Sequence, residues 1–159
     1  MGLKTRYLNT MNITTKGKMS PNTPVTFVSV HARRLENLHY NTSYFHLSFY
    51  NRARDYFRVK FKTRKLLLFY IVTDDYSWAQ DKLWLNVTDL YIIPNSSTTE
   101  HDLALLSLAD YSILSYGTFG LWGAFLANAQ EILVSKKMMQ TTKEGYELQQ
   151  ANLPNVIVI

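Results

Sequence analysis

Short apolar runs alternate with longer amphipathic segments along most of this chain, and the alternation limits the folds that the chain can adopt. The runs typical of strands lie at residues 25–31, 65–72, 90–93, 111–115, 131–134 and 156–159. Apolar side chains recur at every fourth position from Phe45 to Phe61, which is typical of a helix that buries one face. Strands that alternate with helices of about ten residues or more predict a parallel sheet with right-handed crossovers. We therefore expect an α/β fold, a Rossmann-like parallel sheet with helices on both faces.

The length and composition suit one folded domain. The chain has 159 residues, of which 47% are apolar and 18% charged, so a core can form and disorder is not favoured. Residues 1–24 are polar and contain Gly17, Pro21 and Pro24. We predict a lead-in or linker at 1–24 and a domain at 25–159.

Two adjacent arginines, Arg33 and Arg34, follow the first predicted strand. In open α/β sheets, ligands bind beyond the carboxyl ends of the strands. A guanidinium offers a rigid set of donors that fits phosphate oxygens, so the pair could hold a diphosphate. Because neighbouring residues that leave a strand point apart, one arginine alone could meet the phosphates. The alternative is that the pair only solvates a turn.

A glycine-containing turn, Gly117-Thr118-Phe119-Gly120, joins the fourth predicted strand to a helix at 119–128. Such a turn exposes free backbone N–H groups at the positive end of the helix dipole, which favours an anion. Taken alone, the motif is common in α/β proteins. The helix side chains that we expect to face the core are Leu121, Trp122, Phe125 and Leu126.

Acidic side chains occupy further positions near the predicted ligand edge. Asp74 and Asp75 follow the second strand, where a carboxylate could accept the N1–H and N2–H₂ groups of guanine. Asp75 could instead cap the helix that follows, because helix N-caps strongly favour aspartate. Asp102 falls in the first turn of a later helix, capped by Ser97 or Thr99, where an acidic side chain stabilises the helix start.

Three segments in this order resemble the α-1,2-fucosyltransferases, glycosyltransferase family 11. They are H-x-R-R-x-[acid] at 31–36, FYIVTDD at 69–75, and the residues from DLALL to YGTFGLWGAFL at 102–126. The resemblance spans about residues 25–135, and the combination is specific although each segment alone is not.

Three positions depart from the usual family pattern. The family's basic motif usually reads HVRRGDY, so Leu35 replaces a glycine and Glu36 an aspartate, and Ala109 stands where cysteine is common. Glu36 is the carboxylate nearest to the arginines in the sequence. It is a candidate base for the acceptor hydroxyl, with an ion pair to Arg33 or Arg34 as the alternative.

The resemblance implies the C-terminal, donor-binding domain of a GT-B enzyme that transfers fucose with inversion from GDP-fucose to the 2-hydroxyl of a galactoside. It implies no metal cofactor, and the sequence has no D-x-D triplet; Arg33 or Arg34 would neutralise the leaving diphosphate. The implied catalytic residues are Arg33, Arg34 and Glu36. The implied substrate-binding residues are His31, Asp74, Asp75, Asp102, Ser115, Gly117, Thr118, Phe119 and Gly120.

Other functions are open at this stage. Because the chain is about half as long as a two-domain transferase needs, it could be a donor-binding remnant that holds GDP-fucose without catalysis. A purely structural α/β protein would leave the three segments unexplained. The net charge of +5 suits an anionic ligand, and the absence of a G-x-G-x-x-G segment disfavours an NAD-binding domain.

Several patterns disfavour further classes of site. Seven basic residues between 52 and 65 predict a solvated helix face, and no nucleic-acid partner is expected, because no aromatic-rich strand motif accompanies them. The chain has no cysteine, so neither a disulfide framework nor a thiolate metal site can form. His39 and His46 lack the spacing to a carboxylate that a zinc site would need.

The cellular compartment is suggested by sequons and by the resemblance. N-x-[ST] sequons occur at Asn12, Asn41, Asn86 and Asn95, which favours the lumenal side of the Golgi. No run approaches the roughly 20 apolar residues of a membrane span, and residues 1–18 do not read as a signal peptide. The family resemblance implies a membrane attachment only through an N-terminal anchor, which we do not recognise in this chain.

Overall fold

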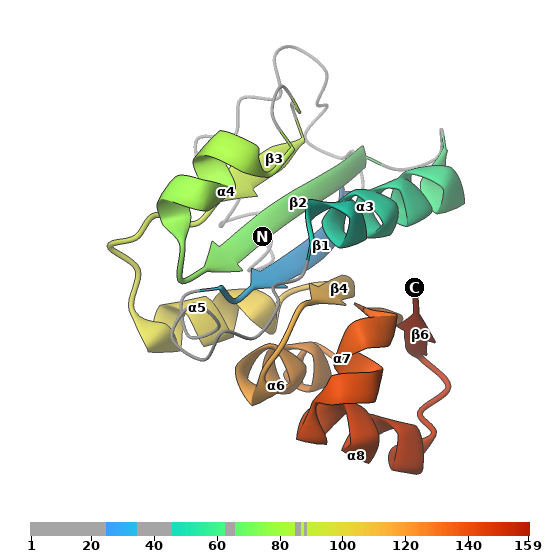
Figure 1. Ribbon diagram of the computed structural model, residues 1–159. Coiled ribbons are helices and arrows are strands. Elements are labelled where there is room, and N and C mark those ends of the chain that lie inside the picture. Colours follow the sequence, from blue (N-terminus) through green and yellow to red (C-terminus); the bar gives the residue numbers. More distant parts are fainter. Residues whose placement is uncertain (1–24, 35–45, 63–65, 85–86, 88) are drawn as a thin grey trace.

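The computed structural model describes residues 25–34, 46–62, 66–84, 87 and 89–159. At its centre is a six-stranded sheet in the order β3-β2-β1-β4-β5-β6, with every pairing parallel (Figure 1). The strands are β1 (Val25–Ala32), β2 (Leu66–Thr73), β3 (Leu90–Ile92), β4 (Tyr111–Leu114), β5 (Ile132–Val134) and β6 (Val156–Val158). This is the strand order of the doubly wound Rossmann sheet, so the predicted α/β fold is confirmed.

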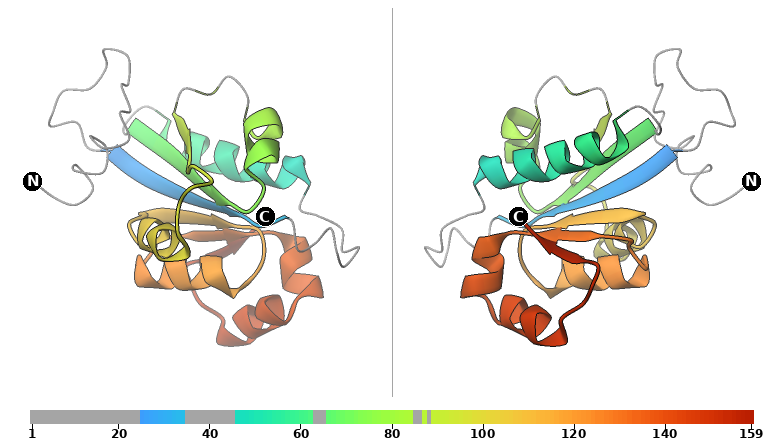
Figure 2. Two further views of the ribbon diagram at one scale, coloured as in Figure 1. Left: turned by 90° about the vertical axis from the view of Figure 1, so that its left-hand side faces the viewer. Right: turned by 90° about the vertical axis from the view of Figure 1, so that its right-hand side faces the viewer.

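Helices cover both faces of the sheet (Figure 2). One face carries α3 (Leu47–Phe61) and α4 (Tyr76–Lys82). The other carries α5 (Thr99–Leu106), α6 (Thr118–Leu126), α7 (Lys136–Thr141) and α8 (Lys143–Ala151). The order of the strands reverses between β1 and β4, which are direct neighbours. In sheets of this kind the ligand crevice lies beyond the carboxyl ends of the strands at that reversal.

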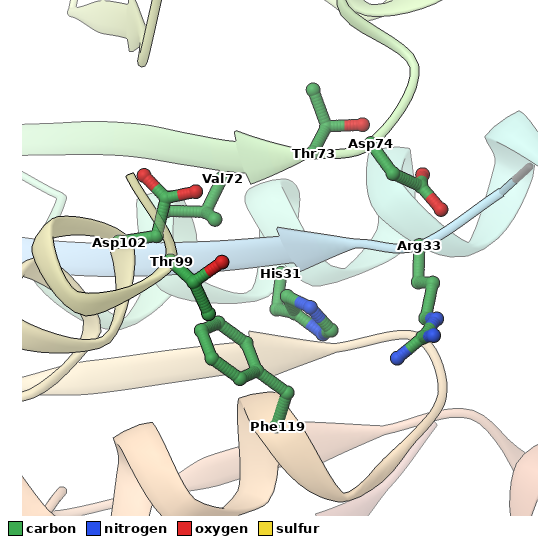
Figure 3. A pocket seen from close by; sticks show the side chains of 8 residues that line it. All are labelled: His31, Arg33, Val72, Thr73, Asp74, Thr99, Asp102 and Phe119. Carbon is green, nitrogen blue, oxygen red and sulfur yellow. The ribbon is translucent and has the colours of Figure 1, made fainter. Parts of the chain in front are cut away.

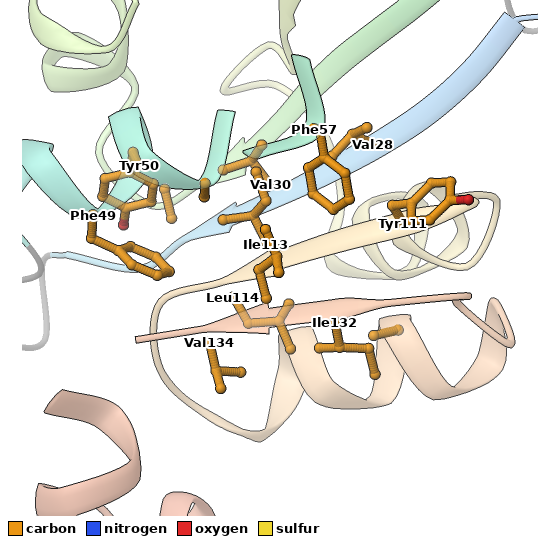
Figure 4. Close-up of a cluster of buried hydrophobic side chains, with 14 of the residues drawn as sticks. Val28, Val30, Phe49, Tyr50, Phe57, Tyr111, Ile113, Leu114, Ile132 and Val134 are labelled. Carbon is orange, nitrogen blue, oxygen red and sulfur yellow. The ribbon is translucent and has the colours of Figure 1, made fainter. Parts of the chain in front are cut away.

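The apolar stripe predicted on the first helix packs against the sheet (Figure 4). Phe49, Ala53 and Phe57 of α3 are buried, and the Phe57 ring centroid lies 5.2 Å from that of Tyr111 in β4. The strand side chains in the same cluster include Val28, Val30, Ile113, Leu114, Ile132 and Val134. Full burial of each large side chain contributes about 1.5–3 kcal/mol, so this layer holds α3 across β1 and β4.

The prediction for the buried face of α6 was wrong at three of its four positions. Leu121 is buried, but Trp122, Phe125 and Leu126 are 61%, 42% and 62% exposed. The helix packs on the sheet through Leu121 and on α5 through Gly123, where an added Cβ would overlap Leu106. With those two sides occupied, the remaining side of this apolar helix faces outward.

Local signals predicted the helix ends less accurately than they predicted the strands. From the sequence, Ser43 is a plausible N-cap for the first helix, but it lies outside the described residues, and the N-cap of α3 is His46. The N-cap of α5 is Thr98, which lies between the two predicted candidates. No helix was predicted between β5 and β6, where α7 and α8 form, because that stretch is mostly polar and its apolar period is short.

Candidate functional site

A pocket of about 240 Å³ lies beyond the carboxyl ends of β1 and β2 (Figure 3). It is lined by His31, Arg33, Val72, Thr73, Asp74, Thr99, Asp102 and Phe119. These side chains come from the exits of two neighbouring strands and from the first turns of α5 and α6. The structure therefore brings together residues from all three segments on which the family resemblance rests.

The exit of β1 is held by side chains from both neighbouring strand exits. The Ser115 hydroxyl donates to the His31 carbonyl at 2.9 Å and accepts the Arg33 N–H at 3.0 Å. On the other side, the Thr73 hydroxyl donates to the Ala32 carbonyl at 2.7 Å. These side-chain hydrogen bonds continue where the backbone hydrogen bonds between the strands end. They fix the position of the backbone that carries the arginines.

The two arginines lie in different surroundings. Arg33 lines the pocket, whereas Arg34 does not. The Nε–H of Arg34 donates to Asp75 at 3.1 Å, and its guanidinium carbon lies 4.0 Å from the ring centroid of Trp78. The Arg34 side chain is therefore committed to an ion pair and a cation–π contact within the protein.

The two aspartates after β2 also differ. The Asp75 carboxylate accepts the Trp78 N–H at 3.0 Å as the N-cap of α4, so the capping alternative for this residue is confirmed. The Asp74 carboxylate accepts the Arg34 N–H at 2.7 Å and lies exposed at the edge of the pocket.

His31 is buried at the floor of the pocket and is 6% exposed. Burial, with a smaller effect of the Arg33 charge, lowers the pKa of the His31 imidazole from 6.5 to about 4, so the ring is neutral at physiological pH. An added Cβ at Gly120 would lie 2.6 Å from Nδ1 of the ring. Glycine at this position therefore makes room for the imidazole.

Asp102 reaches the pocket from the first turn of α5. Its Oδ1 atom is buried and has no hydrogen-bond partner within the part of the chain that the structure describes. An acceptor without a partner costs about 1–3 kcal/mol, and more when it is charged. Such an atom in a pocket is suited to a ligand that donates hydrogen bonds.

The predicted glycine-containing turn brings α6 close to Arg33. Gly117, with φ of 87°, is the N-cap of α6 and has no side-chain cap. An added Cβ at Gly117 would lie 3.5 Å from Nη1 of Arg33, so the guanidinium lies against the start of the helix. Thr118 is exposed, and the Phe119 ring lies 5.6 Å from that of His31. A positive side chain and a helix N-terminus thus meet on one side of the pocket.

Some predicted site residues lie away from the pocket surface. Ser115, Gly117 and Gly120 are buried behind it, and Arg34 and Asp75 hold one another. Glu36, the predicted base, lies outside the described residues.

Three lining residues were not predicted: Val72, Thr73 and Thr99. Val72 and Thr73 are the last two residues of β2, directly before Asp74 and Asp75. Their position at the end of a predicted strand could have identified them as pocket residues. Thr99 reaches the pocket only because α5 packs against the sheet next to β1, which no local pattern predicts.

Within the described residues there is neither a cluster of metal ligands nor a helix that could span a membrane. No group of three or more His, Asp or Glu side chains is arranged to hold a metal ion in the described ranges. Among the helices described, none is both long and apolar enough to span a bilayer.

The fold and the pocket define a Rossmann-like domain with a pocket at the carboxyl edge of its sheet. Residues 8–159 match the family model described as Glycosyl transferase family 11, and the chain belongs to this family.

Among curated proteins, the chain is 26% identical over 119 residues to galactoside alpha-(1,2)-fucosyltransferase 2 of Pongo pygmaeus, which covers 70% of this chain and 34% of that protein. It is 27% identical over the same length to galactoside alpha-(1,2)-fucosyltransferase 1 of Bos taurus, covering 70% and 32%. The chain therefore spans about a third of the length of the curated relatives it matches.

Solved structures of a fucosyltransferase, NodZ, show a more distant similarity. The NodZ structure from Bradyrhizobium has a TM-score of 0.47 and 17% identity, and the match covers 68% of this chain and 37% of that one. NodZ alpha-1,6-fucosyltransferase soaked with GDP-fucose has the same TM-score and 15% identity, with 82% and 44% covered.

Proposed function

We propose that the pocket binds GDP-fucose and that the chain carries the donor-binding part of a galactoside α-1,2-fucosyltransferase of the GT-B type. The observation that carries this proposal is the buried Oδ1 of Asp102, without a partner among the described residues, in the same pocket as Arg33. One end of the pocket offers a hydrogen-bond acceptor and the other a cation, which matches a nucleoside diphosphate whose base donates hydrogen bonds.

Guanine is the base that fits the acceptor best. Its N1–H and N2–H₂ groups can donate side by side to one carboxylate, an arrangement that other bases do not offer. From the sequence, Asp74 or Asp75 was the candidate for this contact. Asp75 is occupied by Arg34 and the cap of α4, and Asp74 lies exposed, so we assign the base to Asp102.

The diphosphate is assigned to Arg33 and the first turn of α6. In an inverting transfer, the β-phosphate leaves with negative charge, and a fixed guanidinium next to a helix N-terminus stabilises that charge as it develops. Arginine would thus replace the metal ion that other transferases use. Glu36 stays the candidate base for the acceptor's 2-hydroxyl.

The Golgi lumen is the compartment we propose, on the basis of the family and the sequons. Asn95 lies exposed in the turn between β3 and α5, where an N-glycan could be added. Membrane attachment would come from an N-terminal anchor.

Calorimetric titration with GDP, GDP-fucose, UDP and ADP tests the donor assignment. We expect binding of the two guanine nucleotides only, unchanged by EDTA, and a loss of about tenfold or more in Asp102→Asn. Asp81→Asn, at an exposed position of α4, is the matched control and should bind as wild type. Equal affinity for UDP would contradict the assignment.

A transfer assay with lactose or phenyl galactoside separates an enzyme from a donor-binding unit. Because the chain spans about a third of its curated relatives, we expect these 159 residues to bind GDP without transferring fucose. Detectable transfer by the purified chain would show that it also holds the acceptor.

A further inference from the structure

Ser115 lies immediately after β4 and is completely buried. Its hydroxyl makes two hydrogen bonds to backbone groups of the β1 exit, as donor to the His31 carbonyl and as acceptor from the Arg33 N–H. Its own N–H donates to the same His31 carbonyl at 3.2 Å. One side chain thus contacts backbone groups on both sides of Ala32.

These hydrogen bonds lie at the point where the backbone pairing between β1 and β4 ends. The last pair of this ladder is His31 with Leu114, so beyond it the strands offer Arg33 no regular backbone acceptor from β4. A buried backbone N–H without a partner is costly, and a flexible exit would let this donor turn to water. The serine hydroxyl supplies the acceptor and keeps the exit of β1 against that of β4.

The same hydroxyl links the two halves of the cationic side of the pocket. Arg33 belongs to the exit of β1, whereas Gly117, against which its guanidinium lies, follows Ser115 by two residues in the exit of β4. Hydrogen bonds weaken steeply with poor angle and distance, so a small shift between the two exits would misalign the guanidinium and the helix N-terminus.

We infer that Ser115 is a positioning residue: its hydroxyl holds Arg33 in register with the first turn of α6, and ligand affinity depends on it without any contact to ligand. This inference rests on the proposed function. Ser115 has no exposed surface and does not line the pocket, so a direct contact with the nucleotide is excluded by its position.

The chain offers a matched control in Ser112. Its hydroxyl is also fully buried and bonds to Ser29 across the same two strands at 3.0 Å, three residues before Ser115. Removing it deletes a buried hydroxyl between β1 and β4 but leaves both bonds of Ser115 in place.

The experiment compares Ser115→Ala, Ser115→Thr and Ser112→Ala by titration with GDP and by amide hydrogen exchange without ligand. In Ser115→Ala we expect about tenfold weaker GDP binding and at least about tenfold faster exchange of the Arg33 amide, the scale of one or two lost hydrogen bonds. Ser115→Thr, which keeps the hydroxyl, should retain both properties. Ser112→Ala should keep wild-type affinity, although its thermal midpoint falls.

Two results would overturn the inference: wild-type affinity and Arg33 protection in Ser115→Ala, or an equal loss of affinity in Ser112→Ala. Failure of the proposed function looks different, since the wild-type protein itself would then not bind GDP. The exchange of the Arg33 amide is measured without nucleotide, so it still tests the hydrogen bond in that case.

Discussion

At the amino end of the sheet the charged side chains pair with one another, whereas at the carboxyl end several of them face a pocket. Asp89 and Glu131 stand just before β3 and β5, and they pair with Arg58 and Lys60 of α3. Asp110, just before β4, accepts the Phe27 N–H at 2.9 Å. These contacts tie helices and strands together and present nothing to a ligand.

At the carboxyl end, the same kinds of polar and charged side chain are not all paired with one another. Asp102 keeps a buried oxygen without a hydrogen-bond partner among the described residues. The lowered pKa of His31 keeps its ring neutral at pH values at which an unperturbed histidine becomes protonated. Both features cost folding free energy, because neither Nδ1 of His31 nor Oδ1 of Asp102 has a hydrogen-bond partner among the described residues. The amino end therefore carries contacts that only stabilise the fold, whereas side chains at the carboxyl end also face the proposed ligand site, and variants at the two ends should have different effects on stability and on GDP binding.

The largest effect is expected from Phe57→Ala, on the face of α3 towards the amino end. Phe57 is fully buried and contacts Tyr111, so the truncation should reduce the free energy of unfolding by about 3–5 kcal/mol. Denaturant unfolding measures the loss. GDP affinity of the protein that remains folded should be unchanged, and a parallel loss of affinity would break the separation between the two ends.

The next effect concerns His31 and pH. The folded-state pKa of about 4 lies below the value of 6.5 for an unperturbed histidine, so the unfolded state binds more protons between these values. Stability should therefore fall as the pH drops from about 6.5 to 4, by roughly 3 kcal/mol at the lower limit. The charged side chains that line the same pocket as His31 are Arg33, Asp74 and Asp102.

Denaturant unfolding of wild type and His31→Asn at pH 7 and pH 4.5 isolates the histidine contribution, because other groups are common to both. The wild-type protein should lose more stability than the variant between these two values. Identical losses would mean that His31 is protonated in the folded protein.

Arg33→Lys and Arg34→Lys sharpen the comparison within the carboxyl end itself. Lysine keeps the charge but loses the planar set of donors, so Arg33→Lys should weaken GDP binding by about 1.5–3 kcal/mol, or ten- to a hundredfold. Arg34→Lys should instead lower the thermal midpoint, because it loses the Nε–H bond to Asp75 and the planar guanidinium over Trp78, and should change GDP affinity less. Titration with GDP and thermal unfolding of both variants measure the two effects. A larger loss of GDP affinity in Arg34→Lys than in Arg33→Lys would assign the phosphates to Arg34.

The smallest effect is expected from Lys60→Met at the amino end. Lys60 pairs with Glu131 and lies 5.3 Å from the ring centroid of Tyr111, but a third of its side chain is exposed. Partly exposed pairs contribute about 0–1 kcal/mol, so the thermal midpoint should move by a few degrees at most and GDP binding not at all. A large loss would show that this cluster contributes more to stability than ion pairs of its kind do.

The sequence by itself determined the six strands in their order along the chain, the parallel sheet and the edge of the sheet at which the pocket lies, but not α7 and α8. These follow from patterns that act over a few residues: apolar periods, glycine turns and the polar residues that end each strand. It left open which arginine faces the pocket, what Asp75 does and which aspartate is without a partner.

Tertiary structure decided those points, because each depends on partners far away along the chain. Arg33 bonds to a serine 82 residues later, and the N–H of Arg34 to an aspartate 40 residues later. The outward side of α6 was likewise set by the positions of α5 and the sheet, although Trp122, Phe125 and Leu126 on that side are apolar enough to be buried. A local pattern can show that a side chain is suited to a contact, but only the packing of distant segments determines whether a partner is there to meet it.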